Sequence, residues 1–102
     1  MKKTTAPKHL SAEAKRLWSN LREEFTIDDA AGLLLLQNVC EAFDRLQEAR
    51  ALIKREGSTI TDRFGQPKQH PAVLTEAGAR QQIYAGLRAL RLEPGTAEMV
   101  IS

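Results

Sequence analysis

Residues 28–57 read DDAAGLLLLQNVCEAFDRLQEARALIKREG, and this stretch decides the fold. Its apolar residues recur at helical spacing along the whole stretch, which indicates one long amphipathic helix. Asp28 and Asp29 carry the negative charge that a helix N-terminus favours, and Gly57 suits the position just after a C-terminus. Glu41 and Arg45 stand in the favoured order for an i,i+4 ion pair. The apolar stripe consists of Leu35, Val39, Ala42, Leu46, Ala49 and Ile53, widened by Leu36, Cys40, Phe43 and Leu52.

This helix is too long for a compact chain of this size. At 1.5 Å per residue, a helix of about 28 residues is roughly 42 Å long. A compact globule of about 100 residues has a radius of gyration near 13 Å, hence a diameter of about 33 Å. The four leucines 33–36 also point all round the helix, and one neighbour cannot bury them all. We therefore expect the helix to project from the monomer or to be covered by another subunit. The candidate core or interface residues are Leu33, Leu36, Phe43, Leu46, Ile53, Tyr84 and Leu87.

The flanking segments predict two further helices and a short connection. Ser11 is a suitable N-cap for a helix at about 11–24, with Trp18 on its apolar face. Residues 57–70 lose the helical period and hold β-branched and turn residues, which predicts a loop or a small β-hairpin. Pro71 can begin a last helix over 71–92, antiparallel to the long one. Its small residues should allow close approach of a neighbouring helix; they are Ala77, Gly78, Ala85, Gly86 and Ala89.

The expected architecture is thus a mainly α single domain over 1–102. It consists of a basic arm (1–10), the first helix and the long helix (11–56), the connection (57–70), the return helix (71–92) and a flexible tail (93–102). The chain is 42% hydrophobic and 27% charged, the balance of an ordinary globular protein. Its longest apolar run, 30–36, is far shorter than the ~20 residues that a membrane span needs, so we expect no membrane partner.

The sequence contains no set of residues that would support catalysis. It has no glycine-rich phosphate loop, and the single Cys40 lies on the apolar side of the long helix, where core packing is favoured over a reactive thiol. The two histidines, His9 and His70, lack the partners that a metal site or a general base requires. His70 instead suits the end of the connection, where it would help to cap the last helix. We therefore predict no enzymatic activity, no metal and no cofactor.

The net charge of +2 conceals an uneven distribution. Residues 1–22 hold six basic residues and one acidic residue, whereas residues 23–57 hold four basic and eight acidic ones. Residues 58–92 hold five basic and two acidic residues, and residues 93–102 hold two acidic ones. A basic start is typical of contact with a polyanion, and equally of a solubilising terminus. The candidate DNA-binding residues are Lys2, Lys3, Lys8, Lys15, Arg16, Arg22, Arg63 and Lys68.

A helix-turn-helix is disfavoured, although the lengths of the first two helices and their link would allow one. A recognition helix presents Arg, Lys, Asn or Gln to base edges near its N-terminus. Here that position holds Asp28 and Asp29, followed by Ala, Gly and Leu. If the chain binds DNA, we expect backbone contacts from the basic residues, multiplied by the copies in an oligomer.

Several motifs, in order, resemble the small subunit of phage terminases. The first is Ala6-Pro7-x-x-Leu10-Ser11-x-x-Ala14-x-x-x-Trp18, followed by Asp28 before the leucine-rich helix. The later ones are Gly57, Gly65-x-Pro67-x-x-His70-Pro71 and Leu87-x-x-Leu90-x-Leu92-x-Pro94. The match spans about residues 6–97; one departure is Arg91, where similar proteins often have glycine.

This resemblance implies a non-catalytic component of a viral genome-packaging motor in the host cytoplasm. Family members form many-subunit rings, bind double-stranded viral DNA at the packaging-initiation region, and recruit and regulate the large subunit that carries the ATPase and nuclease. Two alternatives remain: a dimeric DNA-binding regulator, and a helical assembly or interaction protein without a nucleic-acid role. A closed ring would favour the packaging hypothesis, and a monomer or dimer would favour the alternatives.

Overall fold

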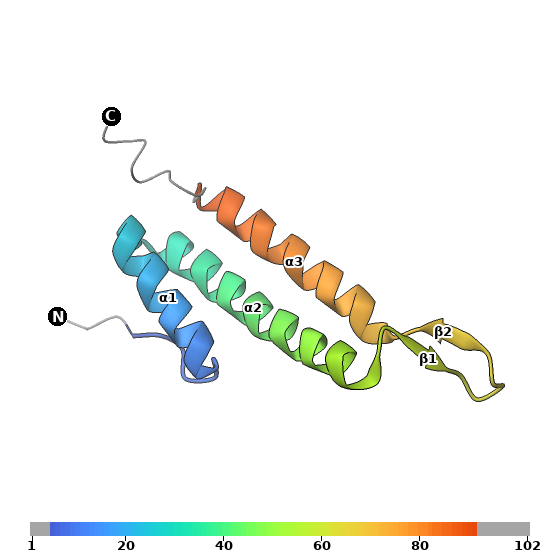
Figure 1. The fold of residues 1–102 in the computed structure, drawn as a ribbon. Helices are drawn as coiled ribbons and strands as arrows, with labels where there is room; N and C mark the ends of the chain where they lie inside the picture. Colours follow the sequence, from blue (N-terminus) through green and yellow to red (C-terminus); the bar gives the residue numbers. More distant parts are fainter. Residues whose placement is uncertain (1–4, 92–102) are drawn as a thin grey trace.

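The computed structural model describes residues 5–91, so Lys2, Lys3 and the expected tail at 93–102 lie outside the described residues. The expected mainly helical fold is confirmed. Helices α2 and α3 run side by side in opposite directions, α1 lies along the first half of α2, and a β-hairpin extends from the far end of the pair (Figure 1). The elements are α1 (Ala12–Phe25), α2 (Ala30–Glu56), β1 (Thr59–Thr61), β2 (Pro67–Gln69) and α3 (Pro71–Ala89).

Each helix begins at a side-chain cap. The Ser11 hydroxyl accepts the Ala14 N–H at 3.0 Å, and the Asp29 carboxylate accepts the Gly32 N–H at 2.8 Å. The Nδ1 atom of His70 accepts the Ala72 N–H at 2.9 Å, which confirms the predicted capping of α3. Gly57 ends α2 with a φ of +86°, a conformation that residues with a Cβ rarely adopt. Local capping chemistry therefore accounts for the helix boundaries.

The main core lies between α1 and the first half of α2. Trp18 and Cys40 are buried there, as expected from their positions on the apolar faces. Of the four consecutive leucines, Leu36 is fully buried, whereas Leu34 is 61% exposed. A single neighbour indeed cannot cover all sides of α2. The core cluster consists of Leu10, Ala14, Trp18, Ile27, Leu36 and Cys40.

Small residues let α2 and α3 approach closely, but not all of those predicted. A Cβ on Gly86 would clash with the Cγ2 atom of Val39, so an alanine there would force the side chain or the helix to shift. A Cβ on Gly78 would meet nothing within 4 Å, and the prediction for Gly78 is wrong. The buried small residues near the start of α3 are Ala72 and Ala79 instead. The reason is that Gly78 lies off the face of α3 that contacts α2, whereas Ala72, Ala79 and Gly86 lie on it.

The chain is elongated, as the length of α2 requires. Its 27 residues correspond to about 40 Å. The Cα radius of gyration is 17.0 Å, with extents of 58 × 32 × 20 Å, compared with about 13 Å for a compact chain of 100 residues. The long helix therefore projects beyond the α1 core instead of being wrapped by it.

Candidate nucleic-acid and subunit interfaces

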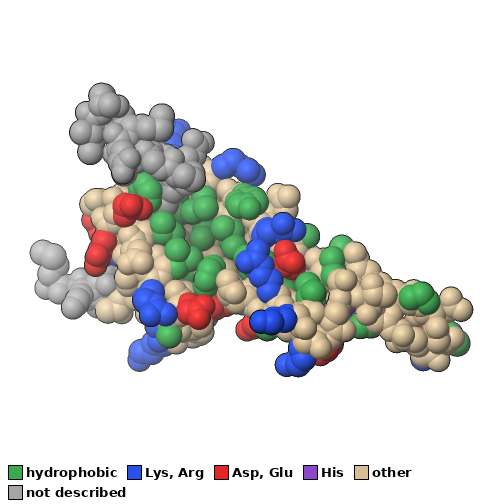
Figure 2. Space-filling model, viewed as in Figure 1, with side chains coloured by type: hydrophobic (Ala, Val, Ile, Leu, Met, Phe, Trp, Pro, Cys, Tyr) green, Lys and Arg blue, Asp and Glu red, His purple; other side chains and the backbone are tan. Residues whose placement is uncertain are grey.

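An apolar groove of about 330 Å³ opens between α1, α2 and α3. Figure 2 shows hydrophobic side chains gathered at the centre of this face, with charged side chains around them. Tyr84 is 53% exposed and Phe43 is half-buried, although both are large apolar groups. The groove is lined by Leu17, Leu21, Val39, Phe43, Leu46, Arg50, Arg80, Ile83, Tyr84 and Leu87.

The groove gathers only part of the predicted interface set. Phe43, Leu46, Tyr84 and Leu87 line it. Leu36 lies in the core of its own chain, with Leu33 packed against that core, and Ile53 is half-buried further along α2. Leu17, Leu21 and Ile83 also line the groove and are absent from the predicted interface set. Periodicity identifies an apolar face but not what lies opposite it.

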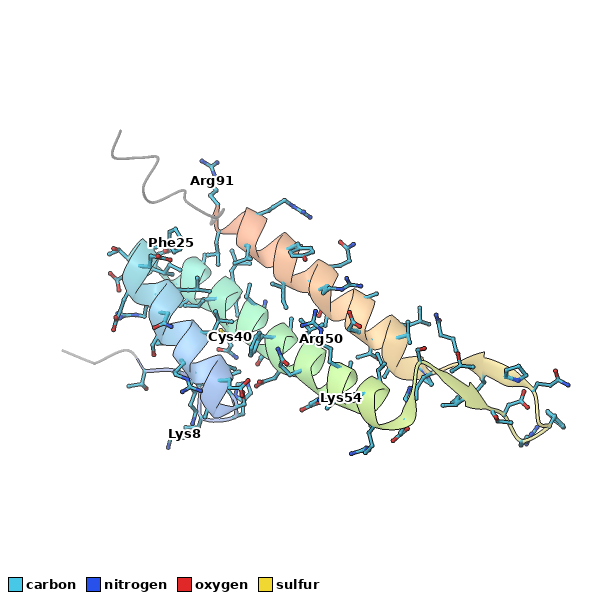
Figure 3. The ribbon with its side chains drawn as sticks, viewed as in Figure 1. Lys8, Phe25, Cys40, Arg50, Lys54 and Arg91 are labelled. Carbon is cyan, nitrogen blue, oxygen red and sulfur yellow. The ribbon has the colours of Figure 1, made fainter. Side chains whose placement is uncertain are left out.

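Two arginines border one end of the groove. Arg50 lies between α2 and α3 (Figure 3), and Arg80 pairs with Glu76 at 3.1 Å.

On another face, Arg45 donates to Gln82 of α3 at 2.6 Å, whereas Glu41 accepts a hydrogen bond from His9 at 2.6 Å. Glu41 and Arg45 each bond a tertiary neighbour instead of one another, although the charge of Arg45 still contributes to lowering the Glu41 pKa after the hydrogen bonds from Gln37 and His9.

Carboxylates of α2 lie against the segment that leads into α1. Lys8, Lys15 and Arg16 are exposed. However, Asp44 accepts the backbone N–H of Ser11 at 2.9 Å, and a hollow beside it is lined by Glu13, Asp44 and Glu48 with His9. Hydrogen bonds from Gln37 and His9 lower the pKa of Glu41 and keep it charged. Because the acidic block packs against the basic one, the positive field of this end is weaker than the sequence blocks indicate.

Arg22 is engaged within its own chain. Its Nη2 atom donates to the Asp28 carboxylate at 2.8 Å, and its guanidinium lies 5.9 Å from the centre of the Trp18 ring. The side chain is only 27% exposed. Arg22 thus joins α1 to the segment before α2, and we leave it out of the DNA surface proposed below.

The other two basic candidates, Arg63 and Lys68, lie on the β-hairpin at the opposite end of the molecule (Figure 1). The hairpin turn is held by the Asp62 carboxylate, which accepts the N–H groups of Phe64 at 2.8 Å and Gln66 at 2.9 Å. Phe64 is 74% exposed, and the Arg63 guanidinium lies 4.9 Å from its ring centre. The structure therefore divides those members of the predicted DNA-binding set that it describes between the α1 region and the hairpin.

His70 fixes the base of the hairpin. Its side chain is 10% exposed, and its Nε2 atom donates to Glu56 at the end of α2 at 2.8 Å. Its backbone N–H donates to the Ser58 carbonyl at 2.8 Å. The hydrogen bond from His70, followed by one from Arg55, lowers the pKa of Glu56. The side chain and backbone of His70 together tie the end of α2, the hairpin and the start of α3.

The described residues include one cysteine, Cys40, and no candidate metal centre. Residues 5–91 contain no group of three or more His, Cys, Asp or Glu side chains placed to hold a metal ion. Burial, together with the nearby charges of Asp44 and Glu41, raises the pKa of the Cys40 thiol to about 12, so it stays protonated in the core. Within the same residues, no helix has the length and apolar character to cross a bilayer.

These features define a class of small helical protein that presents an apolar groove and a projecting β-hairpin to other molecules. A family model described as phage terminase, small subunit, matches residues 11–100, and the chain belongs to this family. Searches of curated proteins and of solved structures find no match. Membership assigns the chain a role in phage DNA packaging, and small subunits of terminases are generally non-catalytic regulators.

Proposed function

We propose that this chain is the non-catalytic DNA-recognition subunit of a phage packaging motor. It assembles into a homo-oligomeric ring, binds viral duplex DNA at the packaging-initiation region, and recruits and regulates the large ATPase-nuclease subunit in the host cytoplasm. The family match over residues 11–100 carries the proposal. The groove and the exposed basic residues support its two physical requirements, self-assembly and DNA contact.

Self-assembly is supported by the groove. Contiguous exposed apolar surface rimmed by charged residues marks interaction sites in soluble proteins. Here the surface combines three helices, and Tyr84 is more than half exposed at its edge. A ring needs a head-to-tail contact, in which a groove on one subunit receives a different surface of the next.

The assembly test is native mass spectrometry of Tyr84→Glu beside the wild-type chain. A charge placed in an apolar interface is costly, so we expect the wild type to form a closed oligomer and Tyr84→Glu to dissociate. The matched control is Leu74→Glu, a position on the same helix that is 71% exposed and does not line the groove. An intact Tyr84→Glu oligomer, or a monomeric wild type, would count against assembly through this groove.

The DNA contact is proposed for Lys8, Lys15 and Arg16, together with Lys2 and Lys3 of the arm. Each phosphate contact contributes about 0.9 to the slope of log affinity against log salt concentration. We therefore expect neutralisation of Lys2, Lys3 and Lys8 to flatten the salt dependence of binding to a mixed-sequence duplex. An unchanged slope would place the backbone contacts elsewhere on the chain. No binding by the wild-type oligomer would refute DNA recognition itself.

A further inference from the structure

We propose that the β-hairpin, residues 58–70, reads base sequence by lying in the major groove of DNA. The inference rests on the proposed duplex binding and adds the element that provides sequence specificity. The helices do not provide this element, because Asp28 and Asp29 stand where a recognition helix would begin, at the start of α2. The hairpin meets three requirements of a groove reader: a polar face, a suitable width and a positive charge.

The polar face follows from the strand register. Thr59 pairs with Gln69, Ile60 with Lys68, and Thr61 with Pro67. Residues directly opposite each other in an antiparallel pair share a face, and the face alternates along each strand. One face therefore carries Thr59, Thr61 and Gln69 beside Pro67, and all four are exposed. Threonine hydroxyls and the glutamine amide both donate and accept hydrogen bonds, as contacts to base edges in the major groove require.

The hairpin also has the dimensions and the rigidity of a groove reader. The major groove is about 12 Å wide and admits a two-stranded ribbon, whose strands lie about 4.8 Å apart. The hairpin extends beyond the end of the helix pair (Figure 1), with its strands largely exposed. Asp62 closes the turn by accepting two backbone N–H groups, and His70 fixes the base. Such an element loses little conformational entropy on binding.

The charge of this end complements DNA. Arg63 and Lys68 are exposed on the hairpin, and Lys54 and Arg55 are exposed in the last turn of α2 at its base. Of the two acidic groups nearby, Asp62 is bonded to the turn, and Glu56 is bonded to His70 and pairs with Arg55 at 3.2 Å. Arg63, Lys68 and Lys54 can contact phosphates beside the groove, while the exposed Phe64 ring adds an apolar contact at the tip.

The experiment begins with the full-length wild-type oligomer and a randomised duplex library. Repeated selection yields a preferred duplex, and affinities for that duplex and a scrambled one are then measured at one salt concentration. In the variant Thr59→Ala/Thr61→Ala/Gln69→Ala, we expect the ratio of the two affinities to fall at least tenfold. Affinity for the scrambled duplex should change less than threefold, because these side chains make no phosphate contact.

The matched control is Thr75→Ala/Gln81→Ala, which removes an exposed threonine and an exposed glutamine from α3. This variant should keep the wild-type affinity ratio. In contrast, Arg63→Ala/Lys68→Ala should weaken binding to both duplexes alike and lower the salt slope by about 1.8. Circular dichroism and native mass spectrometry of every variant establish that fold and oligomer mass are retained.

Three results would overturn the inference. The first is a triple variant that keeps the wild-type affinity ratio. The second is a wild type that binds duplex without any sequence preference. A triple variant that loses its oligomer mass in the absence of DNA would instead show that the hairpin contacts another subunit. Each of these leaves duplex binding by the wild type intact. Failure of the wild type to bind any duplex would refute the proposed function as well, so the two failures are distinguishable.

Discussion

Alanine substitutions at two glycines of α3 should change stability in opposite directions. Gly86 faces Val39 of α2, which is 1% exposed, and an added Cβ would clash with the valine Cγ2. A β-branched side chain in a helix has one strongly preferred rotamer, so Val39 cannot turn away. Overpacking of this kind costs about 1–3 kcal/mol, offset by about 1 kcal/mol from replacing glycine within a helix. We expect Gly86→Ala to lower the free energy of unfolding by up to about 2 kcal/mol.

Gly78 provides the matched control on the same helix. It is exposed, and an added Cβ meets nothing within 4 Å. Gly78→Ala should therefore raise the free energy of unfolding by about 0.5–1 kcal/mol, through helix propensity alone. The assay is urea denaturation followed by circular dichroism at a fixed protein concentration, because assembly would couple to stability. Shifts of the same sign in both variants would refute the α2–α3 packing described here.

A double-mutant cycle separates the clash from other effects of the Gly86 substitution. Val39→Ala alone removes buried volume and destabilises the chain. In the Val39→Ala/Gly86→Ala variant, the added methyl group fills part of that space. We expect the double variant to be more stable than the sum of the two single changes, by about 1–2 kcal/mol. Strict additivity would mean that these two residues do not touch.

Three further predictions test the caps and the charged contacts. His70→Ala removes the acceptor for the Ala72 N–H and should lower the free energy of unfolding by about 1–2 kcal/mol; thermal melting measures this, and no change would contradict the cap. The Glu41 pKa is lowered below its ordinary value of 4.5, so its contribution to stability is present above that pH and is lost as the pH falls through the folded-state pKa. The urea midpoint of Glu41→Gln should therefore be lower than that of the wild type at pH 7, and this difference should be smaller at pH 3. An equal difference at both pH values would refute the assignment. Arg91 has a φ of +60°, and Arg91→Gly should raise the melting temperature by a few degrees because glycine adopts this conformation without strain.

The helix boundaries could be predicted because they depend on local chemistry. Ser11, Gly57 and His70-Pro71 each act on the backbone within a few residues, and the structure confirms each of them. The hairpin was one of two predicted alternatives for residues 57–70, since β-branched and turn residues do not distinguish it from an ordered loop. These signals need no knowledge of tertiary packing.

The surface features could not be predicted because they depend on which faces meet. The charge blocks indicated a basic N-terminus, but α1 lies against α2, so Asp44 and Glu48 line a hollow beside the start of α1. The hydrogen bonds of Glu41 to His9 and of Arg45 to Gln82 could not be predicted for the same reason, since these partners come from other segments. Helical spacing predicts the direction in which a side chain points from the axis of its helix. It does not predict which other segment packs against that side chain.

The positions of the groove and the hairpin make the two proposals compatible. The last groove residue on α2 is Arg50, and the helix continues for another six residues, about 9 Å, to Glu56 before the hairpin begins. The groove residues thus do not include the hairpin, and a contact confined to the groove leaves the hairpin uncovered. In a ring with cyclic symmetry, every hairpin lies at the same height along the ring axis. A duplex that carries several copies of the preferred site can then engage several hairpins at once, so its affinity should exceed that of a single-site duplex by avidity. Equal affinities for the two duplexes would mean that the hairpins act singly.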